Sequence, residues 1–367
     1  MKKYAWAVSF GLALTAFTAY ISLDTFVLSS AYQTDTAQMN TSMFETLKEN
    51  AAARESTTEK ETKTDVPAAD SSSNADKPTN PPSGGSPDGT KPKSGRKRKP
   101  KSETADESTK PESAEVQTDI PKTTVQNSDN DYDYNDENIS IKMTEYYRNN
   151  TKIYVADVRL TSAEYLKTAF ANDTYGKNVT AKTSETAAAN NAVLAVNGDF
   201  YGARESGYVI RNGIAYRDTA SGDDLLCIYA DGTMKVVSQY DYSADELVSQ
   251  GVWQAFAFGP GLVRDGSITV SESDEVGRAM ASNPRTAVGL ISENHYLFVV
   301  SDGRTSESEG LSLYELAEFM KSLSAETAYN LDGGGSSTMY FNGQVINNPT
   351  SNGKIKEREV SDIVYIG

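Results

Sequence analysis

The chain has 367 residues, a formal net charge of −16 at pH 7 and 38% hydrophobic residues. Its one cysteine, Cys227, excludes an internal disulfide framework, and its one histidine, His295, excludes a two-histidine zinc site. Cys227 lies in the apolar run 225–229 and is expected to be buried, whereas His295 is expected in a solvated turn and as a weak candidate for a catalytic triad. We therefore expect chemistry based on carboxylates, arginines, amides, hydroxyls and backbone groups.

The first 33 residues are typical of a membrane anchor. Residues 4–23 are uncharged and mostly apolar, which is just long enough for one helix to cross a bilayer. Lys2 and Lys3 precede this run and Asp24 follows it, so we expect an inward N-terminus and an outward remainder. Small residues at 29–31 leave a cleaved signal peptide as the alternative. The sequence thus predicts a single-pass protein of the cell membrane with its C-terminal domain outside the cell.

Residues 34–138 have the composition of a disordered linker. They are rich in polar and charged residues, proline and glycine, and too few large apolar residues are present to offset chain entropy. A basic block at 91–101 lies between acidic segments. An extended tether across the cell wall is one interpretation, and contact with anionic wall polymer or lipid head groups is the other. No nucleic-acid partner is expected outside the cell.

Regular periodicity begins near Ile139, so the folded domain is expected at 139–367. Capping-box patterns predict helices at 161–170, from Ser243, and at 312–323. Many strands with a few helices predict one α+β domain around a large mixed β-sheet. Apolar or alternating runs predict the strands at 153–160, 192–196, 208–217, 225–229, 234–237, 286–290, 296–300, 327–331, 338–341 and 363–366.

The most specific segment for chemistry is the glycine-rich turn at 328–338. Gly333, Gly334 and Gly335 allow the backbone to approach a ligand closely and to point successive N–H groups at it. Ser336 adds a hydroxyl group, and Asp332 lies at the rim as an acid, a base or a ligand. The spacing fits neither a P-loop nor a nucleophile elbow. A tight turn without a ligand is the alternative.

Further polar side chains adjoin other predicted strands. Asp302 and Arg304 follow one strand, and Asn197 follows the buried strand at 192–196. Arg285 precedes a strand and Arg358 lies ahead of the last one. A planar guanidinium group can clamp a phosphate through two hydrogen bonds. Isolated arginines and aspartates of this kind are more often ordinary surface or turn residues.

Taken in order, six motifs resemble the phosphodiester glycosidase family, and the resemblance covers residue 153 to the C-terminus. The Asn-Leu-Asp-Gly-Gly-Gly-Ser-Ser motif is the most specific of them. The family includes a lysosomal enzyme that removes N-acetylglucosamine from a phosphodiester, and bacterial proteins linked to exopolysaccharide. Asp199 stands where glycine is expected in many relatives, which makes it a weaker catalytic candidate. The motifs lie at 196–201, 258–266, 283–289, 300–304, 330–337 and 348–358.

The resemblance implies a hydrolase that cleaves the C1–O bond of a sugar-1-phosphate diester, and the predicted anchor would place this hydrolase outside the cell. The leaving phosphate monoester is a weak base, so one carboxylate is expected to suffice, unlike the pair that ordinary glycosidases use. We assign Asp302, Asp332 and Arg285 as the catalytic residues. The substrate-binding candidates are Asn197, Asp199, Asn330, Gly333, Gly334, Gly335, Ser336, Arg304 and Arg358.

The partner expected for this site is a phosphodiester-linked sugar or an anionic cell-wall polymer. No cofactor is assigned, and a calcium or magnesium ion that bridges the carboxylates and the phosphate stays open. Two alternatives to the hydrolase stay open as well. One is a non-catalytic module that binds wall polysaccharide, and the other is a metal-dependent phosphodiesterase that cleaves the P–O bond.

Overall fold

The computed structural model describes residues 5–34, 41–62, 133–273 and 282–367. These described residues all belong to one compact unit. The greater part of the predicted linker, with its basic block at 91–101, lies outside the described residues.

Two N-terminal elements precede the predicted linker. Helix α1 covers Ala5–Phe26, and strand β1 (Ser30–Thr34) pairs antiparallel with β6 (Thr174–Lys177). Over the residues that the structure describes, no helix combines the length and the hydropathy that a membrane span requires. The span predicted at residues 4–23 is therefore not confirmed.

A second helix corrects the prediction of disorder from residue 34 onward. Helix α2 covers Thr41–Thr62 and buries Phe44, Leu47 and Ala51, which are spaced to lie on one helix face. Strand β2 (Asp133–Asn135) likewise begins before residue 139, where the folded domain was expected to start. Helix α2 and strand β2 thus place both ends of the predicted linker in the folded unit.

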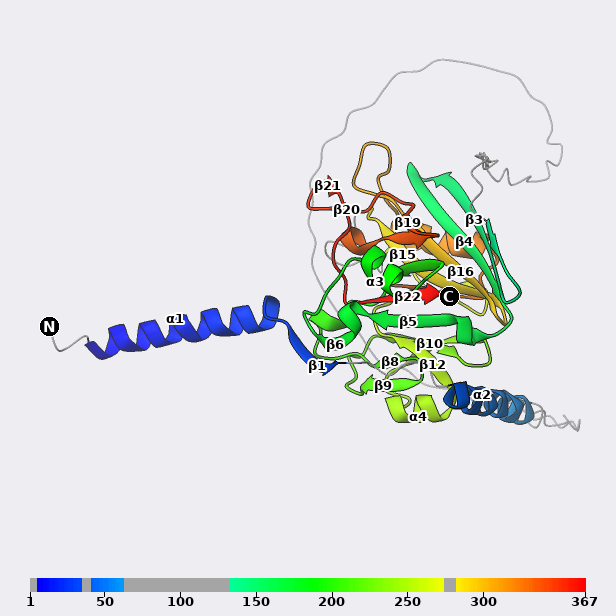
Figure 1. The fold of residues 1–367 in the computed structure, drawn as a ribbon, viewed down its shortest axis with the longest axis horizontal. Helices are drawn as coiled ribbons and strands as arrows, with labels where there is room; N and C mark the ends of the chain where they lie inside the picture. Colours follow the sequence, from blue (N-terminus) through cyan, green and yellow to red (C-terminus); the bar gives the residue numbers. More distant parts are fainter. Residues whose placement is uncertain (1–4, 35–40, 63–132, 274–281) are drawn as a thin grey trace, which may run out of the picture. The chain divides into compact units, whose positions relative to one another are not determined.

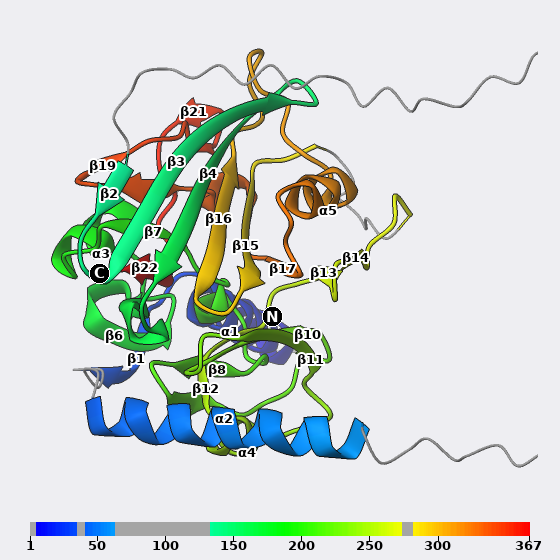
Figure 2. The same cartoon turned by 90° about the vertical axis from the view of Figure 1, so that its right-hand side faces the viewer.

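The largest sheet has eight strands, and each neighbouring pair is antiparallel. Figure 2 shows the long strands β3, β4, β16 and β15 side by side, with helix α5 beside them. Along β4, Tyr154, Ala156 and Val158 enter one core cluster while Ile153 and Val155 enter another. This period-two alternation is why both faces of the sheet are covered. The strand order is β14 (Ser267–Ile268), β13 (Gly261–Arg264), β17 (Thr327–Asn330), β15 (Arg285–Ser292), β16 (His295–Ser301), β4 (Thr151–Leu160), β3 (Ile139–Arg148) and β2.

Two five-stranded antiparallel sheets pack against the same core. The second sheet has the order β11 (Met234–Ser238), β10 (Asp224–Tyr229), β12 (Val252–Phe256), β8 (Val209–Arg211) and β9 (Ile214–Arg217). The third has the order β19 (Gln344–Val345), β18 (Met339–Phe341), β7 (Leu194–Asn197), β22 (Asp362–Ile366) and β5 (Leu166–Phe170). A small hairpin joins β20 (Thr350–Ser351) to β21 (Lys354–Ile355). The shared core includes Tyr154, Val196, Leu226, Phe256, Phe298 and Val364.

The helices of the domain cover the outer faces of these sheets (Figure 1). Helix α5 (Leu313–Ser322) begins with the capping box that the sequence predicted, formed by Ser312 and Glu315, and packs on the eight-stranded sheet. Helix α4 (Ala244–Ser249) packs on the second sheet, and α3 (Thr183–Ala189) packs on the third. Short 3₁₀ turns complete the connections, among them Tyr201–Ala203 and Gly334–Ser336.

The α+β class is confirmed, with differences in detail. The strands divide among several sheets, and the described pairs are all antiparallel, where one large mixed sheet was expected. The helix predicted at 161–170 is wrong: a 3₁₀ turn, Ala163–Tyr165, leads directly into β5. Leu166, Thr168 and Phe170 are buried and alternate with less buried residues. This period of two is that of a strand, and it determines the structure of the segment despite the capping-box pattern before it.

The single cysteine and the single histidine are both buried. Cys227 lies on β10 and is fully buried, as predicted. His295 begins β16 instead of lying in a solvated turn, and its Nε2 lies 2.8 Å from Asp157 Oδ1. Neither residue lines the cavity described next.

Candidate functional site

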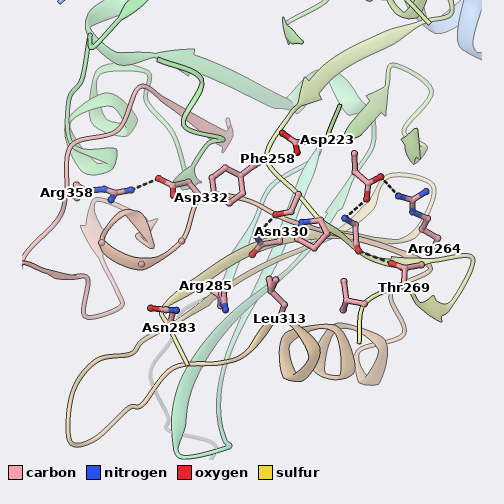
Figure 3. Close-up of a pocket in the computed structure, with 18 of the residues that line it drawn as sticks. Asp223, Phe258, Arg264, Thr269, Asn283, Arg285, Leu313, Asn330, Asp332 and Arg358 are labelled. Atoms are coloured by element: carbon pink, nitrogen blue, oxygen red, sulfur yellow. Dashed lines mark hydrogen bonds and ion pairs between the residues drawn. The ribbon is translucent and has the colours of Figure 1, made fainter. Parts of the chain in front are cut away.

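A cavity of about 810 Å³ opens where the ends of β13, β15 and β17 meet the glycine-rich loop and the segment before β22. Figure 3 shows the Arg358–Asp332 pair on one side, Arg264 and Thr269 on the other, and Phe258 with Asn330 between them. The lining residues are Asp223, Asp224, Phe258, Gly259, Pro260, Gly261, Arg264, Thr269, Val270, Asn283, Arg285, Arg304, Leu313, Asn330, Asp332, Gly333, Gly334, Gly335 and Arg358.

The glycine loop follows β17 and forms part of the cavity wall. The Gly334 N–H donates to the Pro284 carbonyl oxygen over 2.8 Å, which fixes the loop to the segment before β15. Gly334 has a φ of +63°, and a Cβ placed there would lie 2.8 Å from Arg304 Nη2. A Cβ on Gly333 would lie 2.9 Å from the Pro284 oxygen. Glycine is therefore required for the close approach of this loop to its neighbours.

Asp332, at the start of that loop, is the best-positioned carboxylate in the cavity. Its Oδ2 accepts hydrogen bonds from Arg358 Nη2 at 2.5 Å and from Ser336 Oγ at 2.6 Å. Arg358 also donates to Ser336 Oγ through Nε at 2.9 Å, so the three side chains form a closed set. The Asp332 side chain is 12% exposed and that of Arg358 is 40% exposed, which places the arginine toward solvent.

Burial raises the pKa of Asp332 above its ordinary value. The charge of Arg358 and the hydrogen bonds from Ser336 and Arg358 act in the opposite direction and limit this rise in pKa. A carboxyl group with these opposing influences can be ionised near neutral pH and still accept a proton more readily than a surface aspartate. These are the properties of a general base or of a group that stabilises a developing positive charge.

Four arginines make the cavity electropositive despite its three aspartates. Arg285 Nε donates to the Leu311 carbonyl oxygen over 2.9 Å, which aligns the guanidinium group at the start of β15. Arg304 donates through Nε and Nη2 to Asn283 Oδ1, at 3.2 and 2.9 Å. Arg264 pairs with Asp224, Nη2 to Oδ1, over 2.6 Å. Together with Arg358, these groups are suited to an anionic ligand with several oxygens.

Asn330, a predicted substrate-binding residue on β17, lines the cavity. Its Nδ2 donates to the Gly259 carbonyl oxygen over 2.8 Å, and its backbone N–H donates to the Pro260 oxygen over 3.2 Å. These two bonds fix the turn after β12 beside the glycine loop. The Phe258 ring on that turn lies in the cavity, with the Arg204 guanidinium carbon 5.0 Å from its centroid.

Asp302 is not part of the cavity lining, although the sequence assigned it a catalytic role. It is 3% exposed and accepts hydrogen bonds from the Asn348 N–H at 2.8 Å, Asn348 Nδ2 at 3.1 Å and Tyr154 OH at 3.3 Å. Asn347 Nδ2 also approaches it, at 3.4 Å. The geometry makes Asp302 a support for the turn at 347–348, and Asp332 is the predicted carboxylate that lies in the cavity.

Asn197 also lies behind the site and not in its lining. Its Nδ2 donates to the Asp332 carbonyl oxygen over 2.6 Å, and its Oδ1 accepts from Thr286 Oγ1 over 2.8 Å. The Thr338 N–H approaches the same Oδ1 at 3.3 Å. Asn197 therefore positions the glycine loop, because it joins the loop to β15 and to the segment before β18.

Asp199 belongs to a buried ionic cluster with Arg211 and Asp362. Arg211 Nη2 lies 2.9 Å from Asp199 Oδ1, and Arg211 Nε donates to Asp362 Oδ2 over 2.9 Å. Asp199 Oδ2 accepts the Ala257 N–H over 2.9 Å. All three charged side chains are at most 2% exposed. Asp199 is thus unsuited to contact a substrate in the cavity and serves to connect segments beneath it.

Several lining residues were not singled out from the sequence. Asp223 and Asp224 are separated in sequence from the other site segments, whereas Asn283 begins the motif at 283–289. Arg264 and Phe258 lie within one of the six motifs, and that motif was the available signal for them. Within the described residues, no three histidine, cysteine, aspartate or glutamate side chains come together as metal ligands would.

Comparison with known proteins bears on the same part of the chain. Residues 190–367 match the model of the phosphodiester glycosidase family. Over 165 residues the chain is 33% identical to the SPbeta prophage-derived uncharacterized protein YomE of Bacillus subtilis (strain 168), covering 43% of this chain and 25% of that protein. Over 214 residues it is 29% identical to human N-acetylglucosamine-1-phosphodiester alpha-N-acetylglucosaminidase, covering 51% of this chain and 40% of the human protein.

A solved structure shares the fold. The catalytic domain of the zebrafish N-acetylglucosamine-1-phosphodiester alpha-N-acetylglucosaminidase, auto-inhibited by its pro-peptide, superposes with a TM-score of 0.51 at 21% identity. The match covers 67% of this chain and 86% of the zebrafish chain. The chain spans only 25–40% of the length of the curated relatives that it matches. The resemblance drawn from the motifs is confirmed, because residues 190–367 match the phosphodiester glycosidase family and the chain is similar to its mammalian members.

Proposed function

We propose that this protein hydrolyses the glycosidic C–O bond of a sugar-1-phosphate diester. The observation that carries the proposal is the cavity itself, which combines one buried, arginine-paired carboxylate with a glycine loop and further arginines. The family supports hydrolysis of a phosphodiester-linked sugar at a coarse level. The sugar-1-phosphate substrate and the bond that breaks are the finer part of the proposal.

The arginines and the glycine loop are suited to the phosphate. Arg285, Arg304 and Arg358 line one cavity, and a phosphate with two or three exposed oxygens can accept hydrogen bonds from more than one guanidinium group. The backbone N–H groups of Gly333 and Gly335 would add donors there, whereas the Gly334 N–H already donates to the Pro284 carbonyl oxygen. Interactions that strengthen as charge develops on the leaving phosphate lower the barrier to its departure.

Asp332 is the group proposed to serve the sugar. In this scheme water attacks the anomeric carbon, and Asp332 accepts a proton from that water or stabilises the oxocarbenium-like transition state. The C1–O bond breaks, and its electron pair leaves with the phosphate monoester. Because that monoester is a weak base, the reaction does not depend on a second carboxyl group to protonate it.

Hydrolysis in water enriched in heavy oxygen tests which bond breaks. The full chain is incubated with a diester of N-acetylglucosamine-1-phosphate, with and without a chelator, and the products are analysed by mass spectrometry. Label in the free sugar supports C–O cleavage. Label in the phosphate would identify a P–O-cleaving phosphodiesterase, and binding without turnover across a panel of sugars would identify a binding module. Asp332→Asn is the control for activity from a contaminant.

We also propose that the protein is anchored in the cell membrane with the catalytic domain outside. This proposal rests on the sequence: two lysines, an apolar run and a following aspartate. An anionic cell-wall polymer with sugar-1-phosphate linkages would then be an accessible substrate. Protease treatment of intact cells checks the orientation, because an outward domain is degraded while a cytoplasmic control protein stays intact.

A further inference from the structure

Next to the turn that follows α4 lies an apolar surface, the groove, whose residues form one core cluster with Phe44 and Leu47 of helix α2. Trp253 and Ala230 form its base, and both are at most 1% exposed. Gly251 and Gly213 lie at its edges, both with positive φ. A Cβ on Gly251 would lie 2.5 Å from the Leu47 carbonyl oxygen, and one on Gly213 would lie 2.6 Å from Leu47 Cδ1. The groove admits a helix only because these two positions lack side chains.

Helix α2 contacts β12, β10 and α4, and Figure 2 shows its ribbon running alongside these elements. Phe44 meets Trp253 edge to face, with ring centroids 5.0 Å apart and planes at 83°. Phe44, Leu47 and Ala51 are at most 4% exposed, whereas Lys48 and Glu49 on the opposite side are exposed. The packing therefore resembles that of a core element and not that of a loosely attached terminus.

Polar contacts extend the interface beyond the apolar stripe. The Arg54 guanidinium carbon lies 3.8 Å from the centroid of the Tyr229 ring, within cation–π range. Arg54 Nη2 lies 3.6 Å from Asp231 Oδ2 and 3.4 Å from Thr233 Oγ1. These contacts fix the position of the helix along its axis, since Arg54 lies one turn beyond the apolar stripe.

We propose that α2 behaves as a docked peptide. It stays bound to the groove when the chain is cut on both sides of the helix. The polar segment 63–132 then joins two parts of one folded unit, and it is not a spacer that sets the domain apart from the N-terminal residues. Cleavage within that segment leaves α2 in place. The cavity is unaffected in this scheme, because no residue of α2 is among those that line it.

Double cleavage of the full chain tests the proposal. Sites for a sequence-specific protease are inserted within 35–40 and within 84–94, so that digestion frees the fragment with α2 from both β1 and the domain. Gel filtration under native conditions then shows whether this fragment elutes with the domain. We expect co-elution, and separation on addition of urea. A fragment that elutes alone from the otherwise native domain would overturn the proposal.

Aspartate substitutions at two neighbouring positions of α2, one buried and one exposed, provide the matched comparison. Leu47→Asp places a charge in the groove and is expected to release the fragment, whereas Lys48→Asp places the same charge on the exposed side and is expected to retain it. Leu47→Ala serves if Leu47→Asp does not fold before cleavage. Its fragment is expected to bind at least about tenfold more weakly than the wild-type fragment. Equal retention by wild type and Leu47→Ala or Leu47→Asp would also overturn the proposal.

Discussion

At the scale of single residues, Asp332 and Asp302 have the same chemistry and different surroundings. Asp332 lines the cavity and is held by Arg358 and Ser336, whereas Asp302 accepts hydrogen bonds from the 347–348 turn. We expect Asp332→Asn to lower kcat by about 10²- to 10⁴-fold with little loss of stability, because the variant keeps the shape and loses the base.

Asp302→Asn provides the contrast to this prediction. It replaces a buried acceptor with a group that cannot accept at both positions, so we expect a loss of about 1–3 kcal/mol in the free energy of unfolding. The kcat of the folded fraction should stay near that of wild type. Steady-state kinetics and denaturant titrations of both variants provide the measurement. A folded Asp302→Asn enzyme without activity, beside an active Asp332→Asn enzyme, would reverse the two roles.

The pKa of Asp332 links this residue to the pH dependence of activity. Burial raises that pKa, and the Ser336 hydroxyl partly offsets the rise because it stabilises the ionised carboxylate. If Asp332 acts as the base, activity is lost as pH falls through its pKa. Removal of the hydroxyl in Ser336→Ala raises the pKa further, so the acidic limb of the kcat/KM profile should move to higher pH.

Ser337→Ala is the control for this shift. Ser337 is also fully buried, and its hydroxyl has no hydrogen-bond partner among the described residues. Its removal should leave the acidic limb in place. An acidic limb that does not move in Ser336→Ala, or that moves equally in both variants, would show that the limb reports another group.

At the scale of elements, the glycine loop shows how backbone conformation and side-chain placement depend on each other. Gly334 adopts a left-handed backbone and lies against Arg304. We expect Gly334→Ala to lower the free energy of unfolding by about 1–2 kcal/mol through the left-handed conformation. It should also raise the KM for an anionic substrate, because the added methyl group displaces the Arg304 guanidinium.

Gly343→Ala separates these two effects. Gly343 also has a positive φ, +94°, but no atom lies within 4 Å of the position of an added Cβ. It should therefore show a similar loss of stability and an unchanged KM. Thermal unfolding and steady-state kinetics measure both quantities. A KM that rises equally in the two variants would mean that general loosening, and not the displaced arginine, weakens binding.

The elements that the sequence predicted correctly are those with a strong local period. The strands at 153–160 and 225–229 and the capped helix α5 appear where the alternation and the capping box placed them. The strand β5 was mistaken for a helix because a capping-box pattern precedes it. Helix α2 was missed because only Met43, Phe44 and Leu47 are large and apolar in a polar segment, and their partner Trp253 is distant in the sequence.

The site was predictable to the extent that it is local. Gly333, Gly334 and Asp332 occur in one motif, so the sequence alone placed them together. The exclusion of Asp302 from the lining depends on which way a side chain points at the end of β16, which motif order does not reveal. The pairing of Asp224 with Arg264 joins β10 to β13 and depends on the packing of two different sheets.

At the scale of the whole molecule, the buried cluster of Arg211, Asp199 and Asp362 joins two sheets. Arg211 lies on β8 of the second sheet and also donates to the Ala255 carbonyl oxygen on β12 of the same sheet. Asp362 lies on β22 of the third sheet, and Asp199 follows β7 of that sheet. The same cluster supports the turn at 257–260 through the Ala257 N–H, so it connects the assembly of the sheets to the cavity wall.

This cluster holds one arginine for two carboxylates, and its charge therefore depends on pH. Burial raises the pKa of Asp362 from its ordinary 3.8 to about 6, although the Arg211 charge opposes the rise. A carboxyl group whose pKa is higher in the folded state binds its proton more tightly there than in the unfolded chain. Its contribution to the free energy of unfolding is consequently lost as pH rises from about 4 to about 6.

Asp362→Asn cannot ionise and should not show that loss. We expect the free energy of unfolding of Asp362→Asn to increase relative to that of wild type as pH rises through this window. The Arg211→Met variant should lose about 3–5 kcal/mol of its free energy of unfolding, because two buried carboxylates are left without their cation. Denaturant titrations at several pH values measure the difference, with the exposed Asp241→Asn as the control for loss of one carboxylate. A constant difference between Asp362→Asn and wild type would mean that Arg211 keeps both carboxylates ionised. The cluster would then carry a fixed negative charge, and the joint between the two sheets would not respond to pH.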